Sequence, residues 1–419
     1  MVLTPTAISF DDTTGSATRP PQTIAIAKQD VATAPLTGLT LGGITYVGSP
    51  GWLTATLSGS EAPATLTLTA AKGALPPGTY SATVRVTSNV ATNSPQTLTV
   101  TLKLVQRPPP PQPTGTTVTV MAAGNLGCNG DLAKASVAAV AAVQPDYVFV
   151  LGDNAQVSGR AATPDDYMSC FQPGFGQFKL ITYAAVGNGD QLDDTSSVTP
   201  GFSPGADAYF GPERVGAPGK NHYSFDVGSW HIIVLNVIGG GPDMPVPYNR
   251  GSDQDVWLYQ DLRAHASAKC TLAFWHDPLW ISSSRPETPT DSYPNRGYRA
   301  QAIRGTWMRL YEGNADLVIN GGEHIYERFA PMRYEGSYDF PDPTEFRLDS
   351  ARGIVQITSG LAGGGPISTP SVAVTHPLSQ YRSGGNGFLK LVLGEGDYSW
   401  EFINTRYSHV IDSGFGTCH

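Results

Sequence analysis

The chain has 419 residues, of which 15% are charged, and 35 acidic residues against 26 basic ones give a formal net charge of -9. This length exceeds what one compact core usually organises, so we expect two domains, each large enough to bury its own core. The acidic balance argues against a nucleic-acid partner, and the 47 glycines and 34 prolines are typical of a loop-rich extracellular protein.

The first 106 residues alternate short β-branched runs with turn signals. Runs such as TIAIA, TLTLTA and QTLTVTLKLV have the two-residue period of half-buried strands, and GSPG and LPPGTY mark turns between them. Six or seven such strands predict an all-β immunoglobulin-like sandwich over residues 1–106. The segment holds no Cys and no His, so we expect it to serve in adhesion, spacing or support. Its WLTATLSG and LPPGTYSATVRVTS stretches resemble the bacterial immunoglobulin-like BACON modules.

A proline-rich stretch, RPPPPQPTGTT, occupies residues 107–117 and separates two different patterns. Because proline fixes φ and favours extended backbone, we expect a semi-rigid linker here. The first residues lack the basic and apolar regions of a signal peptide, and no apolar run of 18 residues predicts a transmembrane segment. We therefore expect a mature secreted or cell-surface protein to which Met1 was added as a start.

Residues 118–419 change to a mixed α and β pattern. TVTVMAAG and PDYVFVLGDN predict buried strands, and the alanine-rich DLAKASVAAVAAVQPD between them predicts an amphipathic helix, which together form a βαβ unit. YSFDVG, WHIIVLNV, CTLAFWH, ADLVINGG and GIVQITSG predict further strands, with helices at WLYQDLRAHA and TWMRLYEG. This order predicts an α/β domain built in layers.

Polar residues cluster just after the predicted strands of this domain, in the loops where such sheets usually bind ligands. The loops are GNLGC (124–128), GDNAQ (152–156), GNGD (187–190), WHDP (275–278) and GGEH (321–324). From residue type alone, Asp153, Asn188, His276 and His324 make a mixed oxygen and nitrogen set suited to a divalent metal ion.

The motifs LGDN, AVGN, FWHDPLW and ADLVINGGEHIYERFAP, with the ending GFLKLVLGEGDYSWEFI, resemble secreted bacterial metallophosphoesterases of the purple acid phosphatase, or calcineurin-like, type. The resemblance runs from about Val118 to His419, in order and with fitting gaps. It implies a β-sandwich core flanked by helices, and a pair of metal ions that hydrolyses phosphoric monoesters.

The resemblance also assigns a role to the polar loop residues. Four metal-ligand positions of the family are kept: Asp153, Asn188, His276 and His324. Four positions are substituted: Asn125 stands where the family has an Asp ligand, Gln156 where it has a Tyr ligand, Gly189 where it has the catalytic His, and Gly322 where it has a His ligand. The chain therefore lacks the catalytic residue that the resemblance would imply.

These substitutions predict a metal centre too weak for two ions. In the family two aspartates and a tyrosinate, about three negative charges, balance the ions, whereas this chain keeps only Asp153 of those three. We expect no metal ion, or one weakly bound divalent ion on Asp153, Asn188 and His276. Loss of a general acid or base alone typically costs about 10²- to 10⁴-fold in rate.

The leading hypothesis is a secreted pseudo-phosphatase that acts as a surface, binding or assembly module. Its partners would be cell-surface or polysaccharide components, or other copies of the chain. One alternative is an altered phosphoric-monoester hydrolase that runs on one ion, with Asp153, His276 and His324 in use. Another is a protein that binds carbohydrate or cell wall through its N-terminal domain.

Several of these residues also have a simpler explanation. Asp153 and Asn188 suit turn and helix-cap positions, and His276 and His324 suit hydrogen bonding within the crevice. Asp277 is a candidate extra oxygen ligand beside His276. The acidic residues of DQLDD form either a calcium-type site or a solvated loop: Asp190, Asp193 and Asp194. Three residues of EHIYER are expected to support their loop: Glu323, Tyr326 and Arg328.

The four cysteines are widely spaced and never form a CxxC pair, which favours structural disulfides in an oxidising compartment over a zinc site. Four cysteines allow three pairings, and position favours Cys128 with Cys170 and Cys270 with Cys418. The second bond would tie the C-terminal tail to the core.

Overall fold

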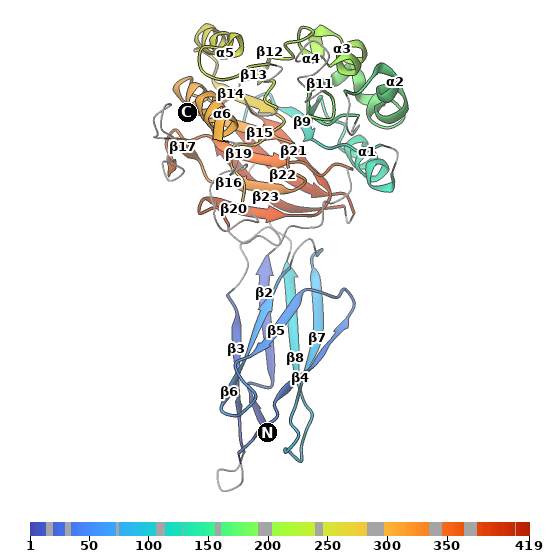
Figure 1. Cartoon of the computed structure of the whole chain (residues 1–419), viewed down its shortest axis with the longest axis vertical. Coiled ribbons are helices and arrows are strands. Elements are labelled where there is room, and N and C mark those ends of the chain that lie inside the picture. The colour runs from blue at the N-terminus through green and yellow to red at the C-terminus, as the bar shows by residue number, and fades with distance from the viewer. Residues whose placement is uncertain are drawn as a thin grey trace. The chain divides into compact units, whose positions relative to one another are not determined.

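The chain of this computed structural model divides into two compact units, Met1–Pro108 and Pro109–His419 (Figure 1). The structure describes residues 1–13, 20–29, 35–72, 75–105, 114–128, 130–155, 161–191, 203–238, 246–282, 297–334, 346–363, 375–406 and 408–419. Most of the proline-rich segment lies outside these ranges. Its last residues belong to the C-terminal unit, where the Thr114 N–H and hydroxyl donate to the Asp397 carboxylate at 2.9 and 2.8 Å.

The N-terminal unit is a sandwich of two four-stranded sheets; the strand pattern predicts the sandwich, but with six or seven strands in place of these eight. One sheet has the order β1 (Val2–Thr4), β3 (Gln22–Ala27), β6 (Ala64–Ala70) and β5 (Leu53–Leu57). The other has the order β2 (Ala7–Thr13), β8 (Gln96–Val105), β7 (Gly78–Thr87) and β4 (Thr40–Val47), with β2 parallel to β8. Alternate residues of β8 such as Leu98, Val100 and Leu102 are buried in the core, as the two-residue period of the sequence predicts.

The C-terminal unit is organised around two larger sheets. The six-stranded sheet has the order β11 (Thr182–Ala185), β10 (Tyr147–Leu151), β9 (Val118–Ala123), β21 (Gly387–Leu393), β22 (Asp397–Asn404) and β23 (His409–Thr417). The seven-stranded sheet has the order β12 (Tyr223–Val227), β13 (Trp230–Val234), β14 (Cys270–Trp275), β15 (Leu317–Asn320), β19 (Val355–Ser359), β16 (Tyr326–Phe329) and β20 (Ser379–Ser383). Strands β9, β10 and β11 run parallel, as do β13, β14, β15 and β19, so the carboxyl ends of each group share an edge.

Helices cover the outer faces of both sheets (Figure 1). Helices α1 (Asp131–Val143) and α3 (Pro204–Phe210) pack on the six-stranded sheet, and α5 (Asp253–Ala264) and α6 (Gly297–Glu312) pack on the seven-stranded sheet. Shorter elements are α2 (Pro164–Asp166), the π-helix η1 (Tyr167–Phe171), the 3₁₀-helix η2 (Phe175–Ile181), α4 (Pro212–Val215), and the paired strands β17 (Met332–Tyr334) and β18 (Phe346–Leu348). Between the sheets, Phe149 stacks on Phe274 with ring centroids 4.8 Å apart. The predicted β-sandwich core flanked by helices is confirmed.

A buried charged group joins the two sheets. Asp412 of β23 accepts hydrogen bonds from the Tyr326 hydroxyl at 2.7 Å and from the Arg328 guanidinium at 2.7 and 3.1 Å. Tyr326 and Arg328 lie on β16, so these bonds cross from one sheet to the other. Their shown partner lies 84 or more residues along the chain, in the opposite sheet, and the expectation that both residues support the loop after β15 stays a prediction.

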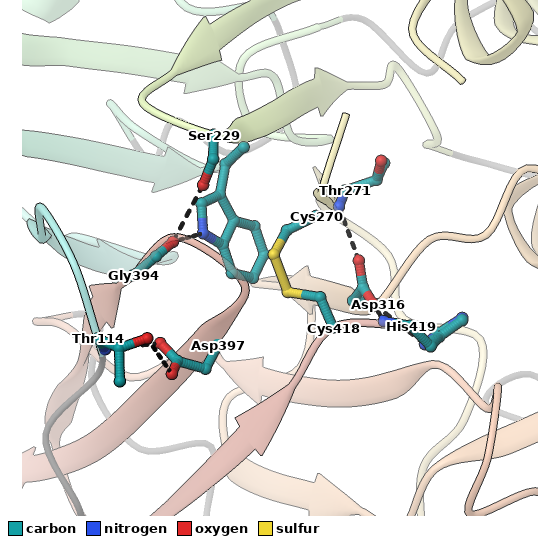
Figure 2. The surroundings of a disulfide bond; sticks show 10 residues. Thr114, Ser229, Cys270, Thr271, Asp316, Gly394, Asp397, Cys418 and His419 are labelled. Carbon is teal, nitrogen blue, oxygen red and sulfur yellow. Dashed lines mark hydrogen bonds and ion pairs between the residues drawn. A yellow bond between two sulfur atoms is a disulfide. The ribbon is translucent and has the colours of Figure 1, made fainter. Parts of the chain in front are cut away.

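Both disulfides favoured by cysteine position are present. Cys128 pairs with Cys170, and Cys270 pairs with Cys418. The second bond joins the first residue of β14 to the residue that follows β23 (Figure 2). It therefore links the seven-stranded sheet to the six-stranded sheet.

Hydrogen bonds surround this second disulfide. Asp316 accepts from the Thr271 N–H at 2.7 Å and from the His419 N–H at 2.9 Å (Figure 2). The Trp230 indole N–H donates to the Gly394 carbonyl oxygen at 2.8 Å. Burial raises the pKa of Asp316 to about 6, which the two N–H donors only partly offset. The described chain end is thus held by covalent and polar contacts from both sheets.

Replacing both Cys270 and Cys418 by alanine should destabilise the protein more than replacing the other cysteine pair. The bond spans 148 residues, and an entropic account gives a loss of about 5 kcal/mol in the free energy of unfolding. The Cys128–Cys170 bond spans 42 residues, for which the same account gives about 4 kcal/mol. Denaturant unfolding of the two double variants measures this difference, and a larger loss for the Cys128–Cys170 variant would contradict it.

His376 is a buried structural histidine with a depressed pKa. Its ring packs against Trp280, Phe329 and Phe346, and its Nδ1 accepts a hydrogen bond from the Leu378 N–H at 3.1 Å. Burial lowers the pKa of His376 from 6.5 to about 4. Because the folded-state pKa is depressed, the stability contributed by the neutral ring is present above pH 6.5 and is lost as the pH falls toward 4.

We expect His376→Asn to reduce this acid sensitivity, because the Asn oxygen can accept the Leu378 hydrogen bond but does not titrate. The variant should be less stable than the wild type at pH 7.5, by about 1 to 2 kcal/mol for a changed buried contact. The difference in the free energy of unfolding between the wild type and this variant should narrow as the pH falls to 4.5. Denaturant titrations at four pH values measure the gap, and a gap independent of pH would show that His376 does not titrate in this range.

Candidate metal centre

Glycine-rich loops follow β9, β10, β11, β15 and β19, and they pack closely against one another. A Cβ on Gly124 would stand 2.7 Å from the Gly321 Cα, and a Cβ on Gly152 would collide with the His276 ring. Gly152 also has a φ of +91°, a backbone conformation that favours glycine. The missing side chains therefore allow these strand ends to converge, and we call the place where they meet the crevice.

Three of the predicted ligands meet in this crevice. Asp153 follows β10, Asn188 follows β11 and His276 follows β14. His276 Nε2 lies 3.1 Å from Asn188 Oδ1 and 3.5 Å from Asp153 Oδ1. Asp153 Oδ1 also accepts a hydrogen bond from the Gly189 N–H at 2.7 Å. A carboxylate oxygen and an amide oxygen thus face the same imidazole nitrogen.

His276 is oriented as metal-binding histidines usually are. Its ring is buried, and Nδ1 donates to the Leu151 carbonyl oxygen at 2.8 Å, which leaves Nε2 directed at Asp153 and Asn188. Burial alone lowers the pKa of His276, but the negative charges of Asp153 and Asp277 outweigh burial and raise it. The crevice therefore favours a positive charge at this point.

Asn125, where the resemblance places an Asp ligand, is part of the loop scaffold. Its Nδ2 donates to the carbonyl oxygens of Gly321 at 2.5 Å and Gly360 at 3.1 Å. The residue is fully buried, and its Oδ1 has no hydrogen-bond partner among the described residues. A carboxylate here would place a negative oxygen against two carbonyl oxygens. The amide therefore suits this position, and it offers a metal ion one neutral oxygen at most.

Asp190 organises the loops of the crevice. Its carboxylate accepts hydrogen bonds from the N–H groups of Asn154 and Gly187 at 2.9 to 3.1 Å and from the Tyr167 hydroxyl at 2.8 Å. Burial, and then the charge of Asp153, raises the pKa of Asp190 to about 6. Asp190 is fully buried, so it is not part of a solvated acidic loop, and the calcium-type site stays a prediction. Its two expected partners lie outside the described residues: Asp193 and Asp194.

Gly322 and Asp277 occupy neighbouring space. A Cβ on Gly322 would stand 2.7 Å from Asp277 Oδ1 and 3.0 Å from the His276 carbonyl oxygen. The Gly322 N–H donates to that carbonyl at 2.7 Å. A carboxylate thus stands beside the place where a side chain at residue 322 would begin. A residue larger than glycine at position 322 would therefore crowd the Asp277 carboxylate.

The last two predicted positions add little to this arrangement. His324 follows β15 and is half-buried, and Gln156 lies outside the described residues. Within the part of the chain that the structure describes, three His, Cys, Asp or Glu ligand atoms gather within 4.8 Å of one another at two places. These groups are Asp226 with His231 and His265, and the disulfide Cys270–Cys418 with Asp316. Asp153, His276 and His324 do not form such a group.

No protein-family model matches the chain. An uncharacterised protein of Mycobacterium tuberculosis is 28% identical over 187 residues, which cover 42% of this chain and 32% of that protein. Purple acid phosphatase 21 of Arabidopsis thaliana is 27% identical over 197 residues, covering 46% and 39%. Acid phosphatase type 7 of Homo sapiens is 26% identical over 200 residues, covering 44% and 43%. The chain thus matches less than half the length of each of these relatives.

A solved structure extends the likeness to the fold. The purple acid phosphatase PPD1 from yellow lupin (Lupinus luteus) seeds matches with a TM-score of 0.50 and 14% identity, covering 95% of this chain and 72% of that one. Together these matches show that the chain has weak homology to purple acid phosphatases and a metallophosphoesterase-type fold.

A pair of metal ions does not fit the described residues. Asn125 is bonded to two carbonyl oxygens, and Gly322 has no side chain to offer. One divalent ion fits better, because Asp153, Asn188 and His276 supply two oxygens and one nitrogen to one point. Such an ion, when bound, would polarise a phosphoryl oxygen.

We expect Gly322→Ala to lower the free energy of unfolding by about 1 to 3 kcal/mol, because its Cβ would overlap Asp277 Oδ1. In an Asp277→Ala background the same change should cost less, with a coupling energy of about 0.5 to 3 kcal/mol. Denaturant unfolding of the wild type, both single variants and the double variant measures this coupling. Strictly additive losses would mean that the two residues do not compete for this space.

Proposed function

We propose that this chain is a secreted pseudo-phosphatase, in which a purple-acid-phosphatase-like fold serves as a surface, binding or assembly module. The observation that carries the proposal is the bonding of Asn125. Its amide donates hydrogen bonds to the carbonyl oxygens of Gly321 and Gly360. A neutral side chain that joins two loops therefore lies where the resemblance places a charged metal ligand. A carboxylate at this position would lose both hydrogen bonds.

The charge of the crevice supports the same proposal. Two divalent ions a few ångströms apart repel each other, and anionic ligands must offset that repulsion. Asp153 and Asp277 are the carboxylates whose charges act most strongly on His276. Two carboxylates balance one divalent ion and leave a second ion uncompensated.

The group expected to move protons is also missing. Gly189 stands where the resemblance places the catalytic His, and its N–H donates to Asp153. Loss of a general acid or base typically costs about 10²- to 10⁴-fold in rate. The remaining crevice therefore suits binding better than turnover.

Two disulfides support export, because such bonds persist in oxidising compartments. None of the described helices has the length and the hydropathy of a membrane span. The N-terminal sandwich has no Cys and no His, so we assign it the role of carrying the C-terminal unit.

An altered phosphoric-monoester hydrolase that uses one ion is the second candidate. It is favoured by the convergence of Asp153, Asn188 and His276, and by the Leu151 carbonyl that orients the imidazole. One ion with these ligands could still activate water. Measured turnover separates this candidate from the first.

We expect no turnover of a chromogenic phosphomonoester by the wild-type chain, purified without chelator, with iron, zinc, manganese or calcium added. Elemental analysis should show that Asp153→Ala removes at most one ion per chain, because one ion at most fits the crevice. The control is Asp165→Ala, which removes an exposed carboxylate in α2 and should change neither result. Turnover that Asp153→Ala abolishes and Asp165→Ala preserves would refute the pseudo-phosphatase and establish the single-ion hydrolase.

A further inference from the structure

A second group of potential ligands lies where β13 meets the end of α5. His231 of β13 has 1% of its side chain exposed, and a carboxylate faces each of its ring nitrogens. Nδ1 lies 2.8 Å from Asp226 Oδ1, and Nε2 lies 2.8 Å from Asp261 Oδ2. Ionised carboxylates only accept hydrogen bonds, so both nitrogens are protonated in this arrangement. Burial lowers the pKa of His231, and the two carboxylates outweigh burial and raise it.

His265 completes the group. It follows the last residue of α5, and its ring stacks on that of His231 with the centroids 3.8 Å apart. Its Nδ1 donates to the Asp261 carbonyl oxygen at 2.9 Å, so Nε2 is the nitrogen that can take another partner. Ligand atoms of Asp226, His231 and His265 lie within 4.8 Å of one another. Three donors therefore stand close enough to share one ion once the His265 ring has turned.

A cavity of about 240 Å³ lies beside this group, and Asp226, His265 and Lys269 are among its lining residues. One liquid water occupies about 30 Å³, so the cavity can admit a hydrated ion. Side chains at its wall can also move, because 64% of the Asp226 side chain and 35% of the His265 side chain are exposed.

We propose that Asp226, His231 and His265 bind one divalent transition-metal ion of the zinc type, with Asp261 as the residue that positions His231. Two imidazoles and one carboxylate are donors that zinc prefers, whereas calcium and magnesium prefer oxygen alone. Asp261 accepts from His231 Nε2, the contact by which carboxylates fix the tautomer and ring of metal-binding histidines. Water in the cavity supplies the fourth ligand.

Two local changes accompany binding. The ion replaces the proton between His231 Nδ1 and Asp226 Oδ1, and these atoms, now 2.8 Å apart, separate to admit bonds of about 2.0 to 2.2 Å to each. His265 turns toward the cavity, because two stacked rings cannot both direct a nitrogen at one ion. The displaced proton passes to solvent, so binding releases a proton.

The proposed site is separate from the crevice and shares no residue with it. Asp226 lies on β12, the edge strand of the seven-stranded sheet, and His265 lies at the end of α5. The Ser224 hydroxyl of β12 also donates to Asp261 at 2.8 Å. A bound ion would therefore fasten the edge strand to the helix that covers the sheet, and would raise stability by mass action.

The test uses the full chain with Asp153→Ala, which removes binding in the crevice. Equilibrium dialysis against Zn²⁺ with elemental analysis should give one ion per chain. Co²⁺ used in place of Zn²⁺ should give the visible absorption of a four-coordinate site with nitrogen ligands. A stoichiometry of zero for Zn²⁺ in this chain would overturn the proposal.

Further variants in the same background identify the ligands. His265→Ala removes a partly exposed ring and should weaken Zn²⁺ binding at least tenfold, and Asp261→Asn should weaken it about 10- to 100-fold through lost positioning. His409→Ala on β23 is the matched control and should leave the affinity unchanged. Equal affinity after His265→Ala, or an equal loss after His409→Ala, would overturn the proposal.

Circular dichroism and thermal unfolding establish that each variant is folded before its affinity is measured. The readouts are metal content and a cobalt spectrum, neither of which depends on turnover. Absence of zinc here would leave the proposed pseudo-phosphatase standing, and turnover in the crevice would leave this site standing.

Discussion

Close packing of glycine loops is the constraint on which the crevice depends. Gly124 meets Gly321 so closely that no side chain fits between them, and Gly152 lies against the His276 ring in the same way. These contacts hold the strand ends together without help from any metal ligand. Ligand side chains can therefore change while the loops keep their places.

The same contacts bear on the proposed loss of metal ligands. Asn125 donates hydrogen bonds to two loops, and Asp190 accepts hydrogen bonds from backbone N–H groups and from the Tyr167 hydroxyl. A buried polar group left unpaired costs about 1 to 3 kcal/mol, so each of these bonds matters for stability. Polar contacts of the protein itself thus hold these loops together.

Three histidines show how far the surroundings decide what a residue does. His376 lies among aromatic rings, and burial lowers its pKa to about 4. His231 lies between two carboxylates that raise its pKa against burial. His276 directs Nε2 at Asp153 and Asn188, as a metal ligand does. His231 lies on a strand, His276 directly follows one and His376 precedes one, and their sequence neighbourhoods alone do not separate these roles.

The long strands and helices of both units could be predicted from the sequence, because alternation, helical period and turn chemistry are local properties of the chain. The crevice could be located for the same reason, since polar residues such as Asp153 and His276 come directly after apolar runs. The disulfide pairing was only favoured among three possibilities, because it joins residues far apart in the chain. The partners of Asp412 and Asp190 could not be read, nor could the meeting of Asp226 with His265. Apart from the Gly187 N–H, which lies three residues from Asp190, those contacts join residues 23 to 86 positions apart, and no local pattern encodes which distant side chain will face a buried charge.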